Sequence, residues 1–253
     1  ARQKYKITPE QLEHAITPRT RLFIFSSPCN PSGAVYSKDE LYALARVFEK
    51  HPEIFIISDE IYEYINYTGQ GHQSIAQFEF IKDRVIVING LSKGFAMTGW
   101  RIGYTASIPE IAKATEKIQG QFTSGTNAIA QRATIAALTE SLEPTYEMVK
   151  QFTARKKRVM ELINTIPQMK CTEPDGAFYV FPDIQSYFGK KAGNTVISDA
   201  NDLCMYLLND AHVSTVSGSA FGTPNNIRLS FANSLPNIEE GFRRIKEYLD
   251  RLS

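Results

Sequence analysis

The amino-acid sequence predicts an α/β fold, and two kinds of segment carry this prediction. Three short apolar runs, at residues 22–25, 54–58 and 85–89, are mostly β-branched or aromatic and continuously hydrophobic. Strands that are buried on both faces of a parallel sheet have this pattern. Between the first two runs, residues 37–40 (Ser-Lys-Asp-Glu) form a capping-box sequence, and apolar residues follow it at helical spacing. Strands that alternate with helices are typical of an α/β domain.

The alternation changes near residue 144, where we place a domain boundary. Residues 1–144 are predicted to form part of a large domain with a mostly parallel sheet. Residues 145–253 are predicted to form a smaller α+β domain, in which longer loops separate fewer elements. The further strands are expected at 102–106, 177–181, 213–216 and 227–231, and the further helices at 109–121, 128–142, 146–166, 198–209 and 236–252.

The composition excludes several classes of protein. The sequence has 253 residues, and 28 lysines and arginines against 27 aspartates and glutamates leave a net charge of +1. This balance gives no general attraction to nucleic acid or to an anionic membrane, and the aliphatic runs are too short to span a bilayer. The 3 cysteines and 4 histidines lack the spacings typical of metal ligands. We therefore expect no metal site and no disulfide framework, and the cysteines suit a reducing cytoplasm.

Polar residues follow the predicted strands at the end where open α/β sheets bind their ligands. Asn30 opens an Asn-Pro-Ser-Gly segment. This segment is either a surface turn or a rigid loop, with a cis Asn30–Pro31 bond as one option, that aims the amide at a ligand. Asp59 directly follows the strand at 54–58, with Tyr62 within reach. Its carboxylate is either a helix N-cap or a functional group, and the sequence favours neither.

Three cationic residues stand in unusual surroundings. Lysines are normally solvated, but Lys93 lies among small residues after a buried strand, and a desolvated lysine is a competent nucleophile for a carbonyl. Arg101 lies beside the only tryptophan, and it is either an ion-paired surface residue or a phosphate ligand. Arg228 lies between apolar neighbours on a short predicted strand. A guanidinium there needs an anion, and a substrate carboxylate is a natural partner.

Taken together and in this order, these motifs resemble those of the fold-type I pyridoxal-phosphate enzymes, specifically class I/II aminotransferases similar to aspartate aminotransferase. The resemblance runs essentially from Ile7 to Leu252. The stretch that contains the lysine and the first arginine is its most specific part. The motifs that carry it are NPSG at 30–33, SDEIY at 58–62, SKGFAMTGWRIGY at 92–104, DGAFYVF at 175–181 and RLSFANS at 228–234.

The resemblance implies pyridoxal 5′-phosphate as the cofactor and a role for each residue around its ring. Lys93 would hold the cofactor as a Schiff base and, once the substrate amine displaces it, would move a proton between substrate and cofactor. Asp59 would pair with the ring nitrogen and keep it protonated, so that the ring acts as an electron sink. Asn30 and Tyr62 would donate hydrogen bonds to the phenolic oxygen.

The resemblance also implies how the anionic groups are bound. Arg101 would bind the cofactor phosphate, and Arg228, together with Asn30, the α-carboxylate of the substrate. Many relatives carry a hydroxyl residue three positions before the lysine as a further phosphate ligand. In this sequence that position is Gly90, and Ser92, directly before the lysine, is the remaining hydroxyl candidate.

The activity that the resemblance implies is transamination between aspartate, or a related amino acid, and a 2-oxo acid such as 2-oxoglutarate, by a cytoplasmic homodimer. Alternatives on the same scaffold are a lyase, a decarboxylase and a non-catalytic regulatory domain. Members of the family begin well upstream of Ala1, and this sequence opens without an initiator methionine. We therefore expect the C-terminal part of a longer enzyme, which on its own is inactive.

Overall fold

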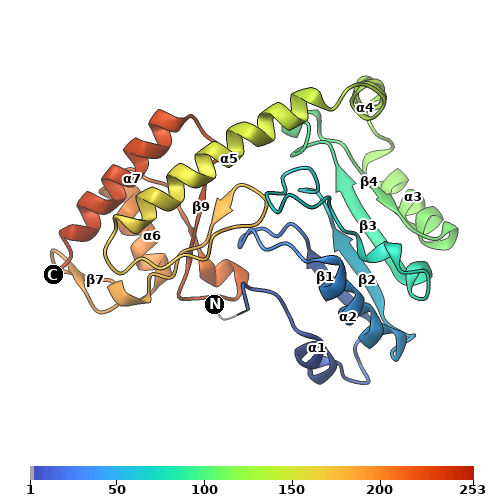
Figure 1. The fold of residues 1–253 in the computed structure, drawn as a ribbon, viewed down its shortest axis with the longest axis horizontal. Coiled ribbons are helices and arrows are strands. Elements are labelled where there is room, and N and C mark those ends of the chain that lie inside the picture. Colours follow the sequence, from blue (N-terminus) through green and yellow to red (C-terminus); the bar gives the residue numbers. More distant parts are fainter. Residues whose placement is uncertain (1–2) are drawn as a thin grey trace. The chain divides into compact units, whose positions relative to one another are not determined.

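The computed structural model describes residues 3–253 and divides them into two compact units (Figure 1). Residues 1 and 2, on which the expectation of a longer chain partly rests, lie outside the described residues. The sheet unit comprises residues 3–29 and Ala34–Val149, and the C-terminal unit comprises Asn30–Gly33 and Lys150–Ser253. The domain boundary at residue 144 stays a prediction.

The sheet unit is built on four strands in the order β1-β2-β3-β4. The strands are β1 (Leu22–Ser26), β2 (Phe55–Asp59), β3 (Val85–Gly90) and β4 (Gly103–Ala106). The first three are parallel, whereas β4 runs antiparallel to β3. The predicted α/β class with a mostly parallel sheet is thereby confirmed, and each strand begins within one residue of its predicted position.

The main core of the sheet unit forms where α2 packs against the strands (Figure 1). The apolar side of α2 carries Leu41, Leu44 and Phe48, which lie in one buried cluster with Ile54 and Ile56. The predicted capping box begins α2, since the Ser37 hydroxyl accepts from the backbone N–H of Glu40 at 3.3 Å and the Glu40 carboxylate accepts from the N–H of Ser37 at 2.8 Å. The helices of this unit are α1 (Pro9–Ala15), α2 (Lys38–Glu49), α3 (Pro109–Thr123) and α4 (Ala128–Thr139), with 3-10 helices at Ile75–Gln77, Lys82–Arg84 and Thr98–Trp100.

The C-terminal unit is an α+β arrangement around a three-stranded antiparallel sheet of order β5-β9-β8. An ion pair between Arg158 and Glu239, 2.7 Å from Nε to Oε1, joins two of its helices. Strand β8 begins at Val216 rather than at the predicted 213, because Val213 instead donates its N–H to Leu207 at the end of the preceding helix. The elements are β5 (Tyr179–Val180), β6 (Lys191–Ala192), β7 (Thr195–Val196), α6 (Ala200–Asn209), β8 (Val216–Ser217), β9 (Ile227–Ser230) and α7 (Leu235–Asp250), with 3-10 helices at Gln185–Tyr187 and Gly218–Phe221. Helix α5 (Glu143–Asn164) begins in the sheet unit and belongs to the C-terminal unit from Lys150 on.

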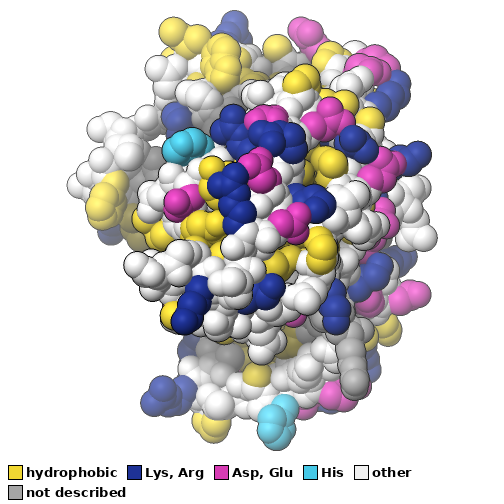
Figure 2. Space-filling model, turned by 90° about the vertical axis from the view of Figure 1, so that its left-hand side faces the viewer, with side chains coloured by type: hydrophobic (Ala, Val, Ile, Leu, Met, Phe, Trp, Pro, Cys, Tyr) yellow, Lys and Arg dark blue, Asp and Glu magenta, His cyan; other side chains and the backbone are white. Residues whose placement is uncertain are grey.

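The surface carries charges of both signs close together. On the face that Figure 2 shows, lysine and arginine side chains are interspersed with aspartates and glutamates. The exposed residues of α7 contribute such pairs, among them Arg243 with Glu240 at 2.7 Å and with Glu247 at 2.8 Å. Within residues 3–253, no helix combines the length and the hydropathy that crossing a membrane requires.

Candidate active site

The carboxyl ends of β2 and β3 bring the central candidate residues of the sheet unit to one edge. These two strands are parallel neighbours, and Asp59, the last residue of β2, lies opposite Ile88 of β3. Tyr62 follows β2, and Lys93 follows β3 in a turn. Because the ends of parallel strands meet at the same edge of a sheet, the fold joins groups that are separate in the sequence. The Nζ atom of Lys93 lies 5.9 Å from the centroid of the Tyr62 ring.

Asp59 is a partly buried carboxylate in a turn. Its Oδ1 atom accepts the backbone N–H of Ile61 at 3.2 Å, and the residues that follow form turns rather than a helix, so the helix N-cap alternative is wrong. Burial raises the pKa of Asp59 above its usual value, and the negative charge of Glu60 raises it further, against the lowering effect of the Ile61 hydrogen bond. A carboxylate of this kind is a strong acceptor for a cationic N–H donor.

The turn that carries Lys93 is held by backbone hydrogen bonds around a buried anchor. Leu91 is fully buried, and its carbonyl accepts the N–H groups of Phe95 and Met97, each at 3.3 Å. The carbonyl of Lys93 accepts the N–H of Ala96 at 3.2 Å. Ser92 is also anchored, since its carbonyl accepts the Thr98 hydroxyl at 3.1 Å. The lysine therefore projects from an ordered turn rather than from a loose loop.

Arg101 is placed by an unusual backbone conformation. It ends the 3-10 helix Thr98–Trp100 with a φ of 53°, in the left-handed region, and its Nη1 atom donates to the carbonyl of Thr98 at 2.8 Å. Across residues 3–253 no carboxylate forms an ion pair with it, so the alternative of an ion-paired surface residue is not supported. A groove of about 800 Å³, also within the sheet unit, is lined by Trp100, Arg101, Thr126 and Asn127, among others.

The absence of a hydroxyl at position 90 has a steric cause. Gly90 ends β3 opposite Gly103 of β4. A Cβ atom at Gly90 would lie 2.9 Å from the Cα of Gly103 and 3.0 Å from the carbonyl oxygen of Ile102. Backbone atoms do not yield to such a contact, so this close approach of β3 and β4 requires a glycine at position 90.

The C-terminal unit contains the second group of candidate residues. Arg228 on β9 donates from Nη1 to the side-chain oxygen of Asn30 at 2.8 Å, across 198 positions of sequence. Its guanidinium lies over two rings, with 4.6 Å to the centroid of Tyr179 and 5.2 Å to that of Phe221. Among the described residues no carboxylate pairs with Arg228. The arginine is thus held by an amide and two rings, and its positive charge is not neutralised.

The segment that carries Asn30 is anchored by the predicted DGAFYVF motif. The carbonyl of Gly33 accepts the N–H groups of Asp175 and Gly176, both at 2.9 Å. Gly33 has a φ of 69°, and a Cβ atom there would lie 2.3 Å from the Cβ of Pro174. The Asn30–Pro31 bond is cis, as considered from the sequence. The two hydrogen bonds that Gly33 accepts favour the rigid loop of the two alternatives over a surface turn.

The predicted site residues therefore fall into two groups. In the sheet unit these residues are Asp59, Tyr62, Ser92, Lys93 and Arg101, and in the C-terminal unit they are Asn30 and Arg228. The contact between the Phe221 ring and Arg228 was not predicted from the sequence. Phe221 lies seven positions before Arg228, and no local pattern indicates that the two side chains meet. Tyr179, the other ring, lies within the DGAFYVF motif at 175–181, but the motif does not indicate this contact.

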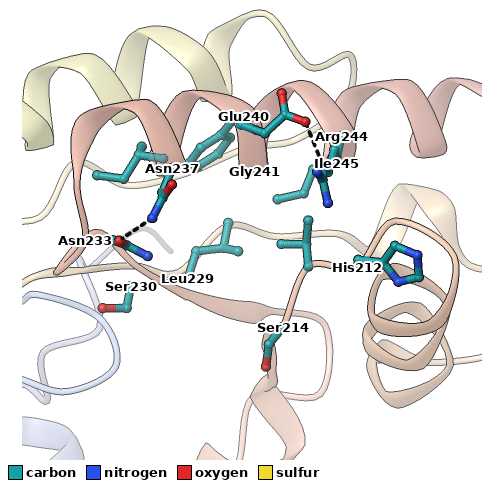
Figure 3. A pocket seen from close by; sticks show the side chains of 13 residues that line it. His212, Ser214, Leu229, Ser230, Asn233, Asn237, Glu240, Gly241, Arg244 and Ile245 are labelled. Atoms are coloured by element: carbon teal, nitrogen blue, oxygen red, sulfur yellow. Dashed lines mark hydrogen bonds and ion pairs between the residues drawn. The ribbon is translucent and has the colours of Figure 1, made fainter.

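A separate cavity of about 400 Å³ lies within the C-terminal unit, between α7 and β9 (Figure 3). None of the predicted site residues lines it. Four of its polar side chains bond in two pairs, because Arg244 donates to Glu240 at 2.7 Å and Asn237 donates to Asn233 at 3.0 Å. Polar side chains that are already paired offer little to a ligand, so we place no function there.

Comparison with known proteins identifies close relatives over nearly the whole chain. The model of the family "aminotransferase class I and II" matches residues 1–245. An aspartate/prephenate aminotransferase of Nitrosomonas europaea is 43% identical over 250 residues, which are 98% of this chain and 63% of that protein. An aspartate aminotransferase of Bacillus subtilis is 41% identical over 250 residues, 98% of this chain and 62% of that protein.

The structural comparison agrees. The crystal structure of the aspartate aminotransferase from Rhizobium meliloti superposes with a TM-score of 0.95 at 39% identity, and the match covers 100% of this chain and 64% of that one. This chain therefore spans less than two thirds of the length of the relatives it matches.

Proposed function

The chain belongs to the aminotransferase class I and II family, and we propose that the protein transfers an amino group between aspartate, or a related amino acid, and a 2-oxo acid such as 2-oxoglutarate. One observation carries the proposal. The half-buried Asp59 and the ordered turn of Lys93 lie at the ends of two adjacent parallel strands, where sheets of this class bind ligands. Relatives named as aspartate aminotransferases support the choice of substrate.

We propose pyridoxal 5′-phosphate as the cofactor, because the donor set fits it. Asp59 has one backbone donor and a raised pKa, which suit an acceptor for a protonated ring nitrogen. Tyr62 lies beside Lys93, as a donor to the phenolic oxygen requires. Arg101, with Ser92, would hold the phosphate. When bound, this cofactor stabilises negative charge that develops on the substrate α-carbon.

The residues of the chain would then have distinct tasks. The Lys93 amine binds the cofactor covalently and, once released, takes a proton from one carbon and returns it to another, as a general base and then an acid. Asp59 keeps a proton on the ring nitrogen. Arg228 binds the α-carboxylate of the substrate through two parallel hydrogen bonds, with its plane set by the Tyr179 and Phe221 rings. Asn30 orients that guanidinium.

The test is the replacement Lys93→Ala in the full-length protein, with Lys38→Ala, an exposed lysine at the start of α2, as the matched control. We expect Lys93→Ala to lower the rate of aspartate–2-oxoglutarate transamination by about 10²–10⁴-fold, and the control to leave it unchanged. Borohydride should link the cofactor to the peptide that contains Lys93 in the wild type and in Lys38→Ala, but not in Lys93→Ala. A Lys93→Ala variant with full activity would refute the proposal.

We further propose a homodimer as the working form. Apolar side chains of α3 and α4 stand exposed, among them Phe122 at 84%, Ile129 at 71% and Ile118 at 61% exposure. No residue of α3, all of which the structure describes, is buried. Large apolar side chains that are exposed to this extent on two successive helices are typical of a region that another protein surface covers.

A further inference from the structure

A buried polar cluster adjoins Asp59, the residue that we propose as the partner of the ring nitrogen. Its centre is the Glu60 carboxylate, of which only 5% is exposed. Its Oε1 atom accepts the hydroxyl of Ser58 at 2.8 Å and that of Ser74 at 2.6 Å, and its Oε2 atom lies 2.8 Å from Nε2 of His72. A carboxylate with three side-chain partners is held in one position, and such networks are costly to disturb. The proposed function does not use any of these groups.

The geometry places this cluster on the face opposite to Asp59. Successive side chains of a strand point to opposite faces, so residues 58 and 60 share a face and residue 59 takes the other. The hydrogen bond between Ser58 and Glu60 confirms the shared face. The N–H of Glu60 also donates to the carbonyl of Ile88 at 2.8 Å, which continues the pairing of β2 with β3. Fixing Glu60 therefore fixes the backbone from which Asp59 projects.

The imidazole of His72 is incompletely bonded. Its Nδ1 atom is buried and has no hydrogen-bond partner within residues 3–253. When His72 is protonated, the ring forms an ion pair with Glu60, and when it is neutral, the negative charge of Glu60 remains uncompensated. His72 is therefore the neighbouring group that can offset the charge of Glu60.

We propose that Glu60 and His72 are positioning residues for the reaction. Glu60 holds Asp59 in place and adds a negative charge that favours a protonated ring nitrogen, and His72 offsets that charge when it is protonated. The inference rests on the proposed function, because the ring nitrogen belongs to the proposed cofactor. The effect of Glu60 on Asp59 supports it, since the charge of Glu60 raises the pKa of that carboxyl.

Three other titratable groups adjoin the pair. Glu63, whose pKa is raised by burial and lowered by the His72 charge and by a hydrogen bond from Asn89, is the other carboxylate near His72. Burial raises the pKa of Tyr104 on β4 and of Tyr64, and the negative charge of Glu63 raises both further, with a contribution from Glu60 at Tyr104. Both phenols therefore keep their proton near neutral pH.

The decisive experiment compares two nearly isosteric variants of the full-length protein, Glu60→Gln and His72→Gln. The first keeps an acceptor for both serine hydroxyls and loses the negative charge, and the second keeps a donor to Glu60 and loses the positive charge. The readout is the ¹⁵N chemical shift of the ring nitrogen in labelled pyridoxal phosphate bound to each protein, measured from pH 5.5 to 8.5. It reports directly whether that nitrogen carries a proton.

We expect Glu60→Gln to move the shift toward the unprotonated value and His72→Gln not to do so. At an effective dielectric of about 20, a unit charge that acts over a distance on the order of 10 Å changes a pKa by roughly one unit. A purely structural role would move both variants in the same direction. Movement of both variants toward the unprotonated value, or no such movement in Glu60→Gln, would overturn the inference.

Two controls separate the possible failures. Ile81→Val removes a buried methyl group elsewhere in the sheet unit, and it should leave the nitrogen shift unchanged despite a small loss of stability. Wild-type protein that forms no borohydride-reducible bond at Lys93 would refute the proposed function itself. Wild-type protein that forms this bond, but whose ring nitrogen is insensitive to Glu60→Gln, would refute only the role of Glu60 and His72.

Discussion

At the scale of single residues, Asp59 illustrates a conflict between stability and the proposed chemistry. Burial raises the pKa of its carboxyl, so the folded protein binds the proton more tightly than the unfolded chain does. The stability of the cofactor-free protein therefore falls as the pH rises through the interval from the unfolded pKa, about 3.9, to the raised value. At neutral pH the Asp59 carboxylate is ionised, and its burial then lowers the free energy of unfolding by the largest amount.

The variant Asp59→Asn should consequently be at least as stable as the wild type at pH 7 without cofactor, because the amide keeps the oxygen that accepts from Ile61 and carries no charge. Its advantage should disappear at pH 3.5, below both pKa values. Affinity for pyridoxal phosphate should fall at the same time. Thermal unfolding at the two pH values and a cofactor titration check this. A larger stability advantage at pH 3.5 than at pH 7 would show that the sign is wrong.

Arg228 yields a second prediction at this scale. In Arg228→Lys the positive charge remains, but the planar fork and its contact with the Tyr179 and Phe221 rings are lost. We expect KM for the amino-acid substrate to rise by about 10–100-fold, as the loss of one charged hydrogen bond implies. Cofactor affinity should remain within about twofold. Arg243→Lys, an exposed arginine of α7, serves as the control and should leave both constants unchanged.

At the scale of secondary structure, the pairing of β3 with β4 limits what position 90 can hold. In Gly90→Ser, the new Cβ atom would lie 2.9 Å from the Cα atom of Gly103. We expect a loss of about 1–3 kcal/mol in the free energy of unfolding, as for overpacking in a core. Gly71→Ser is the matched control, because nothing lies within 4 Å of a Cβ there. Equal denaturation midpoints for the two variants would contradict this account.

The elements themselves could largely be predicted from the sequence. Continuous apolar runs and a capping box placed β1, β2, β3 and α2 within one or two residues, because local patterns decide where such elements begin. The antiparallel direction of β4 could not be predicted, since it depends on which strand it pairs with. The predicted start of β8 was wrong for a similar reason. The backbone N–H of Val213 donates to the carbonyl of Leu207, so Val213 is not part of the strand.

The site could be predicted only where its residues directly follow a strand, and not where they pair across long stretches of sequence. Lys93 and Asp59 could be selected because each directly follows a strand, and the same rule places them at one edge. The pair of Arg228 with Asn30 joins residues 198 positions apart, and no local pattern indicates it. The cluster of Glu60 and His72 was missed although Ser58 and Glu60 stand two positions apart, the spacing of one strand face. An isolated histidine gives no signal of its buried partner.

At the scale of the whole molecule, the exposed apolar residues of α3 and α4 give a prediction about assembly. If a second copy covers them, Phe122→Asp should weaken the dimer by about 30-fold or more, since a central aromatic residue contributes about 2 kcal/mol or more to such an interface. Sedimentation velocity of the full-length protein over a range of concentrations measures this. Met205→Asp, an equally drastic change at an exposed position on α6, should leave the dimer intact.

Two results would contradict the dimer. One is a wild-type protein that sediments as a monomer at all concentrations, and the other is a dimer that Phe122→Asp does not weaken. In the second case another surface joins the subunits.

The Asn30–Gly33 segment packs with the C-terminal unit, although the residues on either side of it belong to the sheet unit. During synthesis, Arg228 leaves the ribosome 198 residues after Asn30. At about 5–20 residues per second this delay is on the order of 10–40 s. Gly33 gains its partners Asp175 and Gly176 before the end of that interval, whereas Asn30 can accept from Arg228 only once residue 228 has left the ribosome.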